Sequence, residues 1–195
     1  ISLGLVGSEM CIRDSRLHGD QPVPIDSAED YSNALTSAGV IVERQERAEL
    51  IRSQLKASAD QLNGAPDCPE SLFEELVDLV ESPRLLQGAI ADRFLALPPE
   101  VIITVMQAHQ RYVPLKVPDV TPDPLQLAAT GVLKQEFLLV GNGLEQADAV
   151  ITRGNERVLA ARLADAEFFL YLDRRQPSSS RRDALARVTF AEGLG

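Results

Sequence analysis

A short polar cluster, His109, Gln110, Arg111 and Tyr112, carries the side chains best suited to contact a phosphate or a base. Arginine offers a planar fork of donors to phosphate oxygens, and an imidazole, amide or phenol can hydrogen-bond a base edge. Alternation along a strand would place His109, Arg111 and Val113 on one face and the other two residues on the opposite face. The same residues could instead end a helix and begin a structural strand, and the sequence favours this second interpretation slightly.

Residues 154–169 have the pattern of a strong amphipathic helix, with Asn155 and Arg162 on its apolar side. The predicted apolar side comprises Val158, Leu159, Ala166 and Phe169, with Leu163 and Leu170 at its margin. A buried arginine keeps its charge, so Arg162 must pair with a carboxylate or point at an anionic partner. We expect Arg162 to be largely buried and to form a structural ion pair, with Asp165 three residues on as its nearest candidate.

The chain lacks the residue patterns of familiar catalytic, nucleotide-binding or metal sites. A Gly-Asn-Gly turn at residues 141–143 follows an apolar run, but no Gly-x-x-x-x-Gly-Lys or Gly-x-Gly-x-x-Gly pattern is present. His109 has no nucleophile at motif spacing, and the two histidines and two cysteines show no metal-ligand spacing. The sequence therefore predicts no catalytic residue, no bound cofactor and no metal site in this segment.

Negative charge dominates the first part of the chain but not the last. The net charge is −10; residues 1–142 carry 21 acidic and 11 basic side chains, and residues 143–195 carry 8 of each. Affinity for a phosphate backbone comes from Lys and Arg, which release its counterions. The first part therefore argues against an RNA surface, and the last part is compatible with one.

The periodic patterns predict an α+β fold, mainly helical, with a small sheet built around residues 109–115 and 136–140. We expect the flanking helices to start near Glu43, Pro99 and Leu144. Shorter helices are expected over residues 26–38, 69–82 and 88–97, although the second half of 69–82 could be a strand. The apolar run at 40–42 could also be a strand.

Residues 1–15 differ in character from the rest of the chain. Their apolar run is too short for a membrane span and lacks the basic start and cleavage site of a signal peptide. The peptide resembles a translated sequencing-adaptor artefact, so we expect an artefactual leader that is not part of the fold. The domain would then occupy residues 16–175, with 176–195 as a linker and the start of the next segment.

Four blocks of sequence resemble, in order and approximate separation, the β subunit of bacterial heterotetrameric glycyl-tRNA synthetase. They are LVESP at 79–83, FLALPPEV at 94–101, MQAHQRY at 106–112 and GNERVLAARLADAEFF at 154–169. Ser82 stands where the family usually has Trp, and the loop at residues 117–124 departs from the family's usual glycine-containing turn. The resemblance covers most of residues 16–195 and implies an N-terminal-half fragment of a β chain.

This resemblance implies a role in an α2β2 aminoacyl-tRNA synthetase. In the family, activation of glycine with ATP is housed in the α subunit, and the β subunit is associated with tRNA binding and needed for transfer of glycine. ATP is thus implied for the holoenzyme and not for this fragment. The implied partners are the α subunit, tRNA(Gly) and the remainder of the β chain, with no membrane; two cysteines without a disulfide framework indicate a cytoplasmic location.

Two functions remain open for the fragment itself: contact with tRNA, or a scaffold that only packs against other parts of the synthetase. The candidate tRNA-binding residues are His109, Arg111, Tyr112, Arg153 and Arg157. If these three arginines and Arg162 form one electropositive surface, RNA contact is favoured. If they scatter or are all ion-paired, the scaffold is favoured.

Deleting residues 1–15 should leave the melting temperature unchanged, because a foreign leader makes few contacts with a domain. Thermal unfolding of the complete and shortened chains measures this. A large drop in Tm on deletion would show that these residues belong to the fold.

Overall fold

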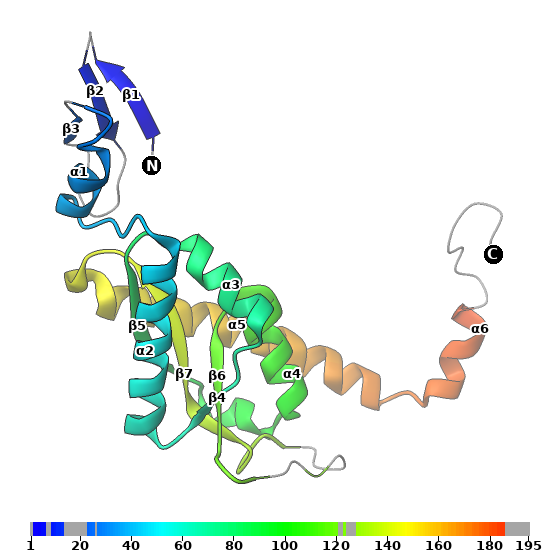
Figure 1. Ribbon diagram of the computed structural model, residues 1–195. Helices are drawn as coiled ribbons and strands as arrows, with labels where there is room; N and C mark the ends of the chain where they lie inside the picture. The colour runs from blue at the N-terminus through cyan, green and yellow to red at the C-terminus, as the bar shows by residue number, and fades with distance from the viewer. Residues whose placement is uncertain are drawn as a thin grey trace.

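A computed structural model of the 195-residue chain describes residues 2–6, 9–13, 23–25, 27–120, 123 and 128–185. Its main body is a four-stranded antiparallel sheet with helices on both faces (Figure 1). A smaller sheet and a short helix lie at the N-terminal end, and one long helix extends beyond the body. The α+β class with mainly helical content is therefore confirmed.

Strand β7, Leu133–Asn142, is the central element of the main sheet. The strand order is β4-β6-β7-β5, and each neighbouring pair is antiparallel. On one side β7 pairs along the whole of β5, Pro83–Ala89, and on the other side it pairs with β6, Val113–Lys116. The two-residue strand β4, Ala65–Pro66, forms the edge beside β6.

Helices cover both faces of this sheet. One face carries α2, Arg44–Leu62, and α3, Glu70–Leu79. The other carries α5, Asp148–Arg174, and α4, Pro99–Thr104, which continues as the π-helix η2, Val105–Gln110. The short elements are the 3-10 helices η1 (Asp92–Ala96), η3 (Glu145–Ala147) and η4 (Ser178–Arg181) and the helix α6 (Arg182–Leu185).

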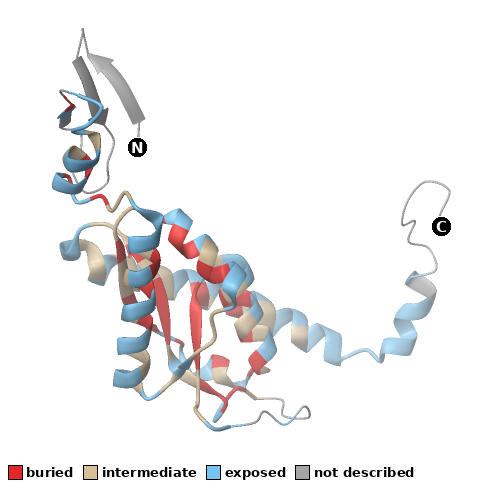
Figure 2. Cartoon of the chain, in the orientation of Figure 1, coloured by how far each residue is buried: buried red, intermediate tan, exposed pale blue. Residues whose placement is uncertain are grey.

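Two hydrophobic clusters meet at β7, because alternate residues of a strand point to opposite faces of a sheet. Phe137 and Leu139 belong to the cluster with α4, η2 and α5, whereas Leu138 belongs to the cluster with α2 and α3. All three side chains are buried, and the strands appear as a buried layer between helices in Figure 2. The uninterrupted apolar run at residues 137–140 is therefore the signature of a strand buried on both faces.

The N-terminal sheet has the order β1-β2-β3, with strands Ser2–Val6, Glu9–Arg13 and Val23–Ile25 in antiparallel pairs. Helix α1, Tyr31–Ser37, follows it. Ile25, Leu35 and Val40 form a small cluster of their own. Residues 10–12 of β2 pair with residues 23–25 of β3, and the leader interpretation stays a prediction.

Helices begin close to the three expected starts, and β6 and β7 provide the expected pair of strands. The helix expected over residues 88–97 is wrong, because residues 83–89 form β5 and only η1 follows. Proline is tolerated at the first residue of a strand, and the partner of β5 is distant in sequence, so local periodicity gave no signal. Residues 40–42 have no strand conformation. None of the described helices is both long and apolar enough to cross a membrane.

The strand expected over residues 109–115 begins later than predicted. His109 and Gln110 form the end of the π-helix, and Arg111 has a left-handed φ of 56° that turns the chain before β6. The predicted alternation of His109 with Arg111 and Val113 on one strand face is therefore wrong. A helix end and a turn replace the first half of the strand.

Gly88 in β5 lies directly against the ring of Phe137. A Cβ at Gly88 would stand 2.5 Å from Phe137 Cζ, and that ring is fully buried, so Gly88→Ala should destabilise the chain by about 1–3 kcal/mol. Gly154→Ala is the matched control, because a Cβ there meets nothing within 4 Å and alanine in a helix should stabilise by roughly 0.5–1 kcal/mol. Denaturant unfolding measures both variants, and equal free energies of unfolding would contradict the prediction.

Candidate nucleic-acid interface

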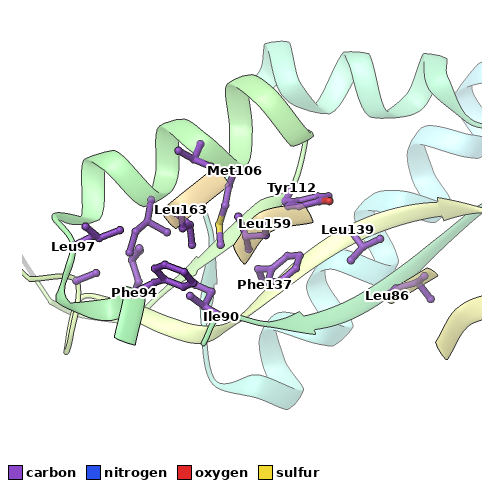
Figure 3. Close-up of a cluster of buried hydrophobic side chains, with 14 residues drawn as sticks. Leu86, Ile90, Phe94, Leu97, Met106, Tyr112, Phe137, Leu139, Leu159 and Leu163 are labelled. Atoms are coloured by element: carbon purple, nitrogen blue, oxygen red, sulfur yellow. The ribbon is translucent and has the colours of Figure 1, made fainter. Parts of the chain in front are cut away.

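Helix α5 carries most of the candidate residues, and a four-residue repeat defines its packed face. Leu159 and Leu163 are buried in the same cluster as Met106 and Phe137 (Figure 3). One and two turns earlier, Asn155 and Ile151 continue this face and are half-buried. Beyond Leu163, Ala164, Ala166 and Leu170 still pack against this cluster, and the other residues of the helix there are exposed (Figure 2).

A hydrogen bond between Tyr112 and Asn155 joins the start of β6 to α5. The Tyr112 hydroxyl donates to Asn155 Oδ1 at 2.6 Å, and Asn155 Nδ2 donates to the Ile151 carbonyl at 2.7 Å. Tyr112 is 3% exposed, and its ring centroid lies 5.0 Å from that of Phe137. Burial raises the pKa of the phenol, so the hydroxyl remains a donor at neutral pH. Tyr112 is thus a core residue, and its proposed role in tRNA binding does not suit its position.

His109, Arg111 and Tyr112 do not form one cluster. His109 is exposed at the end of η2, and the left-handed turn at Arg111 sends the next side chain into the core. Arg111 itself turns toward α3, where its Nε donates to Glu75 Oε2 at 2.8 Å. The structure therefore separates three neighbours that the sequence had suggested as one site.

Arg153 and Arg157 lie one turn apart on the exposed side of α5, away from Leu159 and Leu163. Neither has an ion-pair or hydrogen-bond partner in the described part of the chain. By contrast, five other arginines are ion-paired: Arg44, Arg52, Arg84, Arg111 and Arg181. Arg153 and Arg157 are therefore two adjacent positive charges available to an anionic partner.

The predicted burial of Arg162 and its ion pair with Asp165 are wrong. Both residues are exposed, and no ion pair joins them. At about 100° per residue Arg162 lies roughly 60° from Leu159, at the margin of the packed face and not within it. Val158 and Phe169, expected on the apolar core side, are likewise exposed. The real packed face is rotated toward Asn155 and Leu163, and Asn155 alone of the two polar residues lies on it.

Arg111, Arg153, Arg157 and Arg162 do not make one electropositive surface. Arg111 is ion-paired on the α3 side, and Arg162 lies about 140° around α5 from Arg157. Only Arg153 and Arg157 share a side of the helix. Any RNA contact by these arginines is therefore confined to this pair.

Contacts between β5 and α5 fix the orientation of the long helix, and the sequence had not indicated them. Glu156 Oε1 accepts a hydrogen bond from the Ala89 backbone N–H at 2.9 Å. At the start of α5, Asp148 is ion-paired with Arg84 of β5. Both contacts join α5 to residues of β5 that are distant in sequence, so no local sequence pattern could have identified them.

The described residues offer no evident reacting centre. No group of three or more His, Cys, Asp or Glu side chains among them could hold a metal ion. A cavity of about 310 Å³ opens beside Tyr112 and Asn155, with Leu76, Arg111 and Leu139 among its lining residues. The phenol of Tyr112, the amide of Asn155 and the guanidinium of Arg111 are already hydrogen-bonded to protein partners. These three side chains are therefore not free to bind a ligand in this cavity.

Comparison with known proteins identifies the family. A family model described as "Glycyl-tRNA synthetase beta subunit" matches residues 1–195. The chain belongs to this family. It is 38% identical over 191 residues to the glycine--tRNA ligase beta subunit of Psychromonas ingrahamii, covering 97% of this chain and 26% of that protein. The corresponding subunit of Natranaerobius thermophilus is 35% identical over 195 residues, covering 100% of this chain and 27% of that protein.

The family match confirms the resemblance carried by the four sequence blocks. The Acinetobacter baumannii subunit is 36% identical over 180 residues, which is 92% of this chain and 24% of that protein. The chain thus spans about a quarter of the length of the curated relatives that it matches.

Asn155→Ala should lower the free energy of unfolding by about 1–3 kcal/mol, because it leaves the buried Tyr112 hydroxyl without its acceptor. Arg162→Ala on the same helix is the control and should change stability by less than about 0.5 kcal/mol. Denaturant unfolding of both variants, with Tyr112→Phe to complete a double-mutant cycle, measures the coupling. A larger loss of stability in Arg162→Ala than in Asn155→Ala would contradict the prediction, because it would favour a buried ion pair of Arg162.

Proposed function

We propose that this segment is a non-catalytic part of a glycyl-tRNA synthetase β subunit, and that Arg153 and Arg157 contact the tRNA backbone. The whole synthetase would attach glycine to tRNA(Gly), using ATP in its α subunit, as an α2β2 heterotetramer in the cytoplasm. Family membership and the identity of the relatives, each a glycine--tRNA ligase beta subunit, support this assignment.

The observation that supports an RNA contact is the position of Arg153 and Arg157. Both are exposed on α5 and have no ion-pair partner among the described residues. Arg153 and Arg157 are four residues apart, so their Cα atoms lie about 6 Å apart along the helix axis and one extended anionic partner can contact both side chains. The segment that holds them, residues 143–195, is electrically neutral, whereas residues 1–142 carry the whole net charge of −10. A phosphate backbone would therefore meet less repulsion at α5 than at the first part of the chain.

Such a contact would position the tRNA without identifying its sequence. Arginine contacts to phosphate oxygens set register and orientation, whereas base edges carry the sequence information. Tyr112 is buried and Arg111 is ion-paired, so neither supports base recognition from this surface. Recognition of tRNA(Gly) would then belong to other parts of the synthetase.

A scaffold without RNA contact is the second candidate, and the separation of the four arginines favours it. Arg111 is neutralised by Glu75, and Arg162 lies on a different side of α5 from Arg153 and Arg157. In that case α5 would serve only to pack against the rest of the synthetase. Binding measurements on the arginine pair distinguish the two candidates.

Replacing both Arg153 and Arg157 by Ala in the full-length β subunit, assembled with the α subunit, should weaken tRNA binding. The slope of log K against log salt should fall by roughly one for each lost phosphate contact. The double Lys variant should keep most of that slope because it keeps both charges. Arg52→Ala is a surface control, since Arg52 already lies 3.7 Å from Glu70 and stacks on Phe73. An unchanged slope in the double Ala variant would reject the contact and leave the scaffold.

A further inference from the structure

Helix α5 has a second apolar side that nothing in the described chain covers. Its residues recur at helical spacing and form what we call the outer stripe: Val158, Ala161, Phe168, Phe169 and Leu172. Phe168 and Phe169 are 57% and 62% exposed, and their ring centroids lie 5.6 Å apart in an edge-to-face arrangement. Leu159 and Leu163 point to the other side, into the body. A helix with apolar residues on two sides is typically packed between two layers, and only one layer is described here.

Two charged residues accompany the outer stripe without neutralising each other. Arg162 and Asp165 are both exposed and three residues apart, yet they form no ion pair. Arg162 lies at one edge of the stripe, and Asp165 lies near its middle. A partner for this surface should therefore present an apolar face with an acidic group opposite Arg162 and a basic group opposite Asp165.

The turn after α5 lies beside the end of the outer stripe. Arg181 of η4 forms an exposed ion pair with Asp173 of α5 at 2.7 Å. A cavity of about 510 Å³ lies in this bend, and Phe169 and Leu172 are among its lining residues. In α6, Leu185 is 69% exposed. The bend therefore combines Phe169 and Leu172 of the stripe with polar residues, among them Asp173, Arg175 and Arg181.

We propose that the outer stripe is the docking surface for the remaining part of the full-length β subunit, which would cover it with an apolar, oppositely charged face. This chain covers 26% of the length of its Psychromonas ingrahamii relative, so 74% of that subunit lies outside the described segment. A covalently attached segment reaches a high effective concentration at such a surface, which a separate subunit or a second copy does not. The proposal rests on family membership and not on the RNA contact of Arg153 and Arg157.

Oxidative footprinting of the unmodified full-length β subunit tests the proposal without any substitution. Phe169 and Tyr171 are matched probes, since they are 62% and 59% exposed but lie on different sides of α5. Tyr171 lies under the Arg175 guanidinium, at 5.3 Å from its ring centroid, on the side of Arg153 and Arg157. With each rate divided by its rate in the urea-unfolded subunit, Phe169 should react more slowly than Tyr171 by about tenfold.

This protection should be present in the β subunit alone and independent of its concentration. Equal normalised rates for Phe169 and Tyr171 would overturn the proposal. Protection that appears only with the α subunit, only with tRNA, or only at high concentration would also overturn it. The outer stripe would then be covered by the α subunit, by tRNA or by a second β subunit.

A second measurement uses the thiol reactivity of Phe169→Cys against Arg153→Cys in the same full-length subunit, read site by site by peptide mass spectrometry. Position 153 lies at the same angle around α5 as Tyr171 and about 160° from Phe169. Half-burial raises the pKa of the native Cys68 thiol to about 11, so this thiol should react slowly and not obscure the comparison. Slower labelling at position 169 than at 153 supports the proposal, and equal labelling contradicts it. Neither measurement depends on tRNA binding, so loss of the salt effect at Arg153 and Arg157 would leave this docking surface intact.

Discussion

Burial of β7 on both faces is the constraint on which the rest of the structure depends. Phe137 and Leu139 point into one hydrophobic cluster and Leu138 into the other, so the strand separates two layers of helices and belongs to both. Polar substitution on either face would place an unsatisfied group in a core. The approach of Phe137 to Gly88 shows how closely β5 is fitted to the same strand. Leu159 and Leu163 of α5 belong to the same cluster as Phe137, so the strand also determines the orientation of this helix.

The packing of α5 determines where both candidate surfaces lie. Leu159 and Leu163 fix one side of the helix, the bond from Tyr112 to Asn155 fixes its rotation, and Glu156 ties it to the edge of β5. With the rotation fixed, Arg153 and Arg157 must face away from the body. Ala166 and Leu170 continue the packed face, which leaves Phe168 and Phe169 exposed on other sides of the helix. One buried face thus determines both candidate surfaces.

Local charge pairing explains why few positive charges remain available. Residues 1–142 contain many carboxylates, and arginines such as Arg44 and Arg111 are bound by acidic residues of α3. Exposed pairs of this kind contribute little to stability, but they remove positive potential from the surface. On α5 the positions flanking Arg153 and Arg157 on their side of the helix hold no partner for them. An anionic partner would therefore find a neutral surface with two free guanidinium groups.

The sequence alone determined the α+β class, the family, the buried run of β7 and the existence of α2, α4 and α5, because these depend on local periodicity and on ordered motifs. It did not reveal β5, whose partner strand is distant in the chain, nor the turn at Arg111 that separates His109 from Tyr112. It also placed Arg162 in the core, since a helix with apolar residues on two sides gives no local sign of which side meets the sheet. Only tertiary packing decides that rotation, because burial of Leu159 and Leu163 against Phe137 stabilises one orientation and leaves Arg162 in solvent.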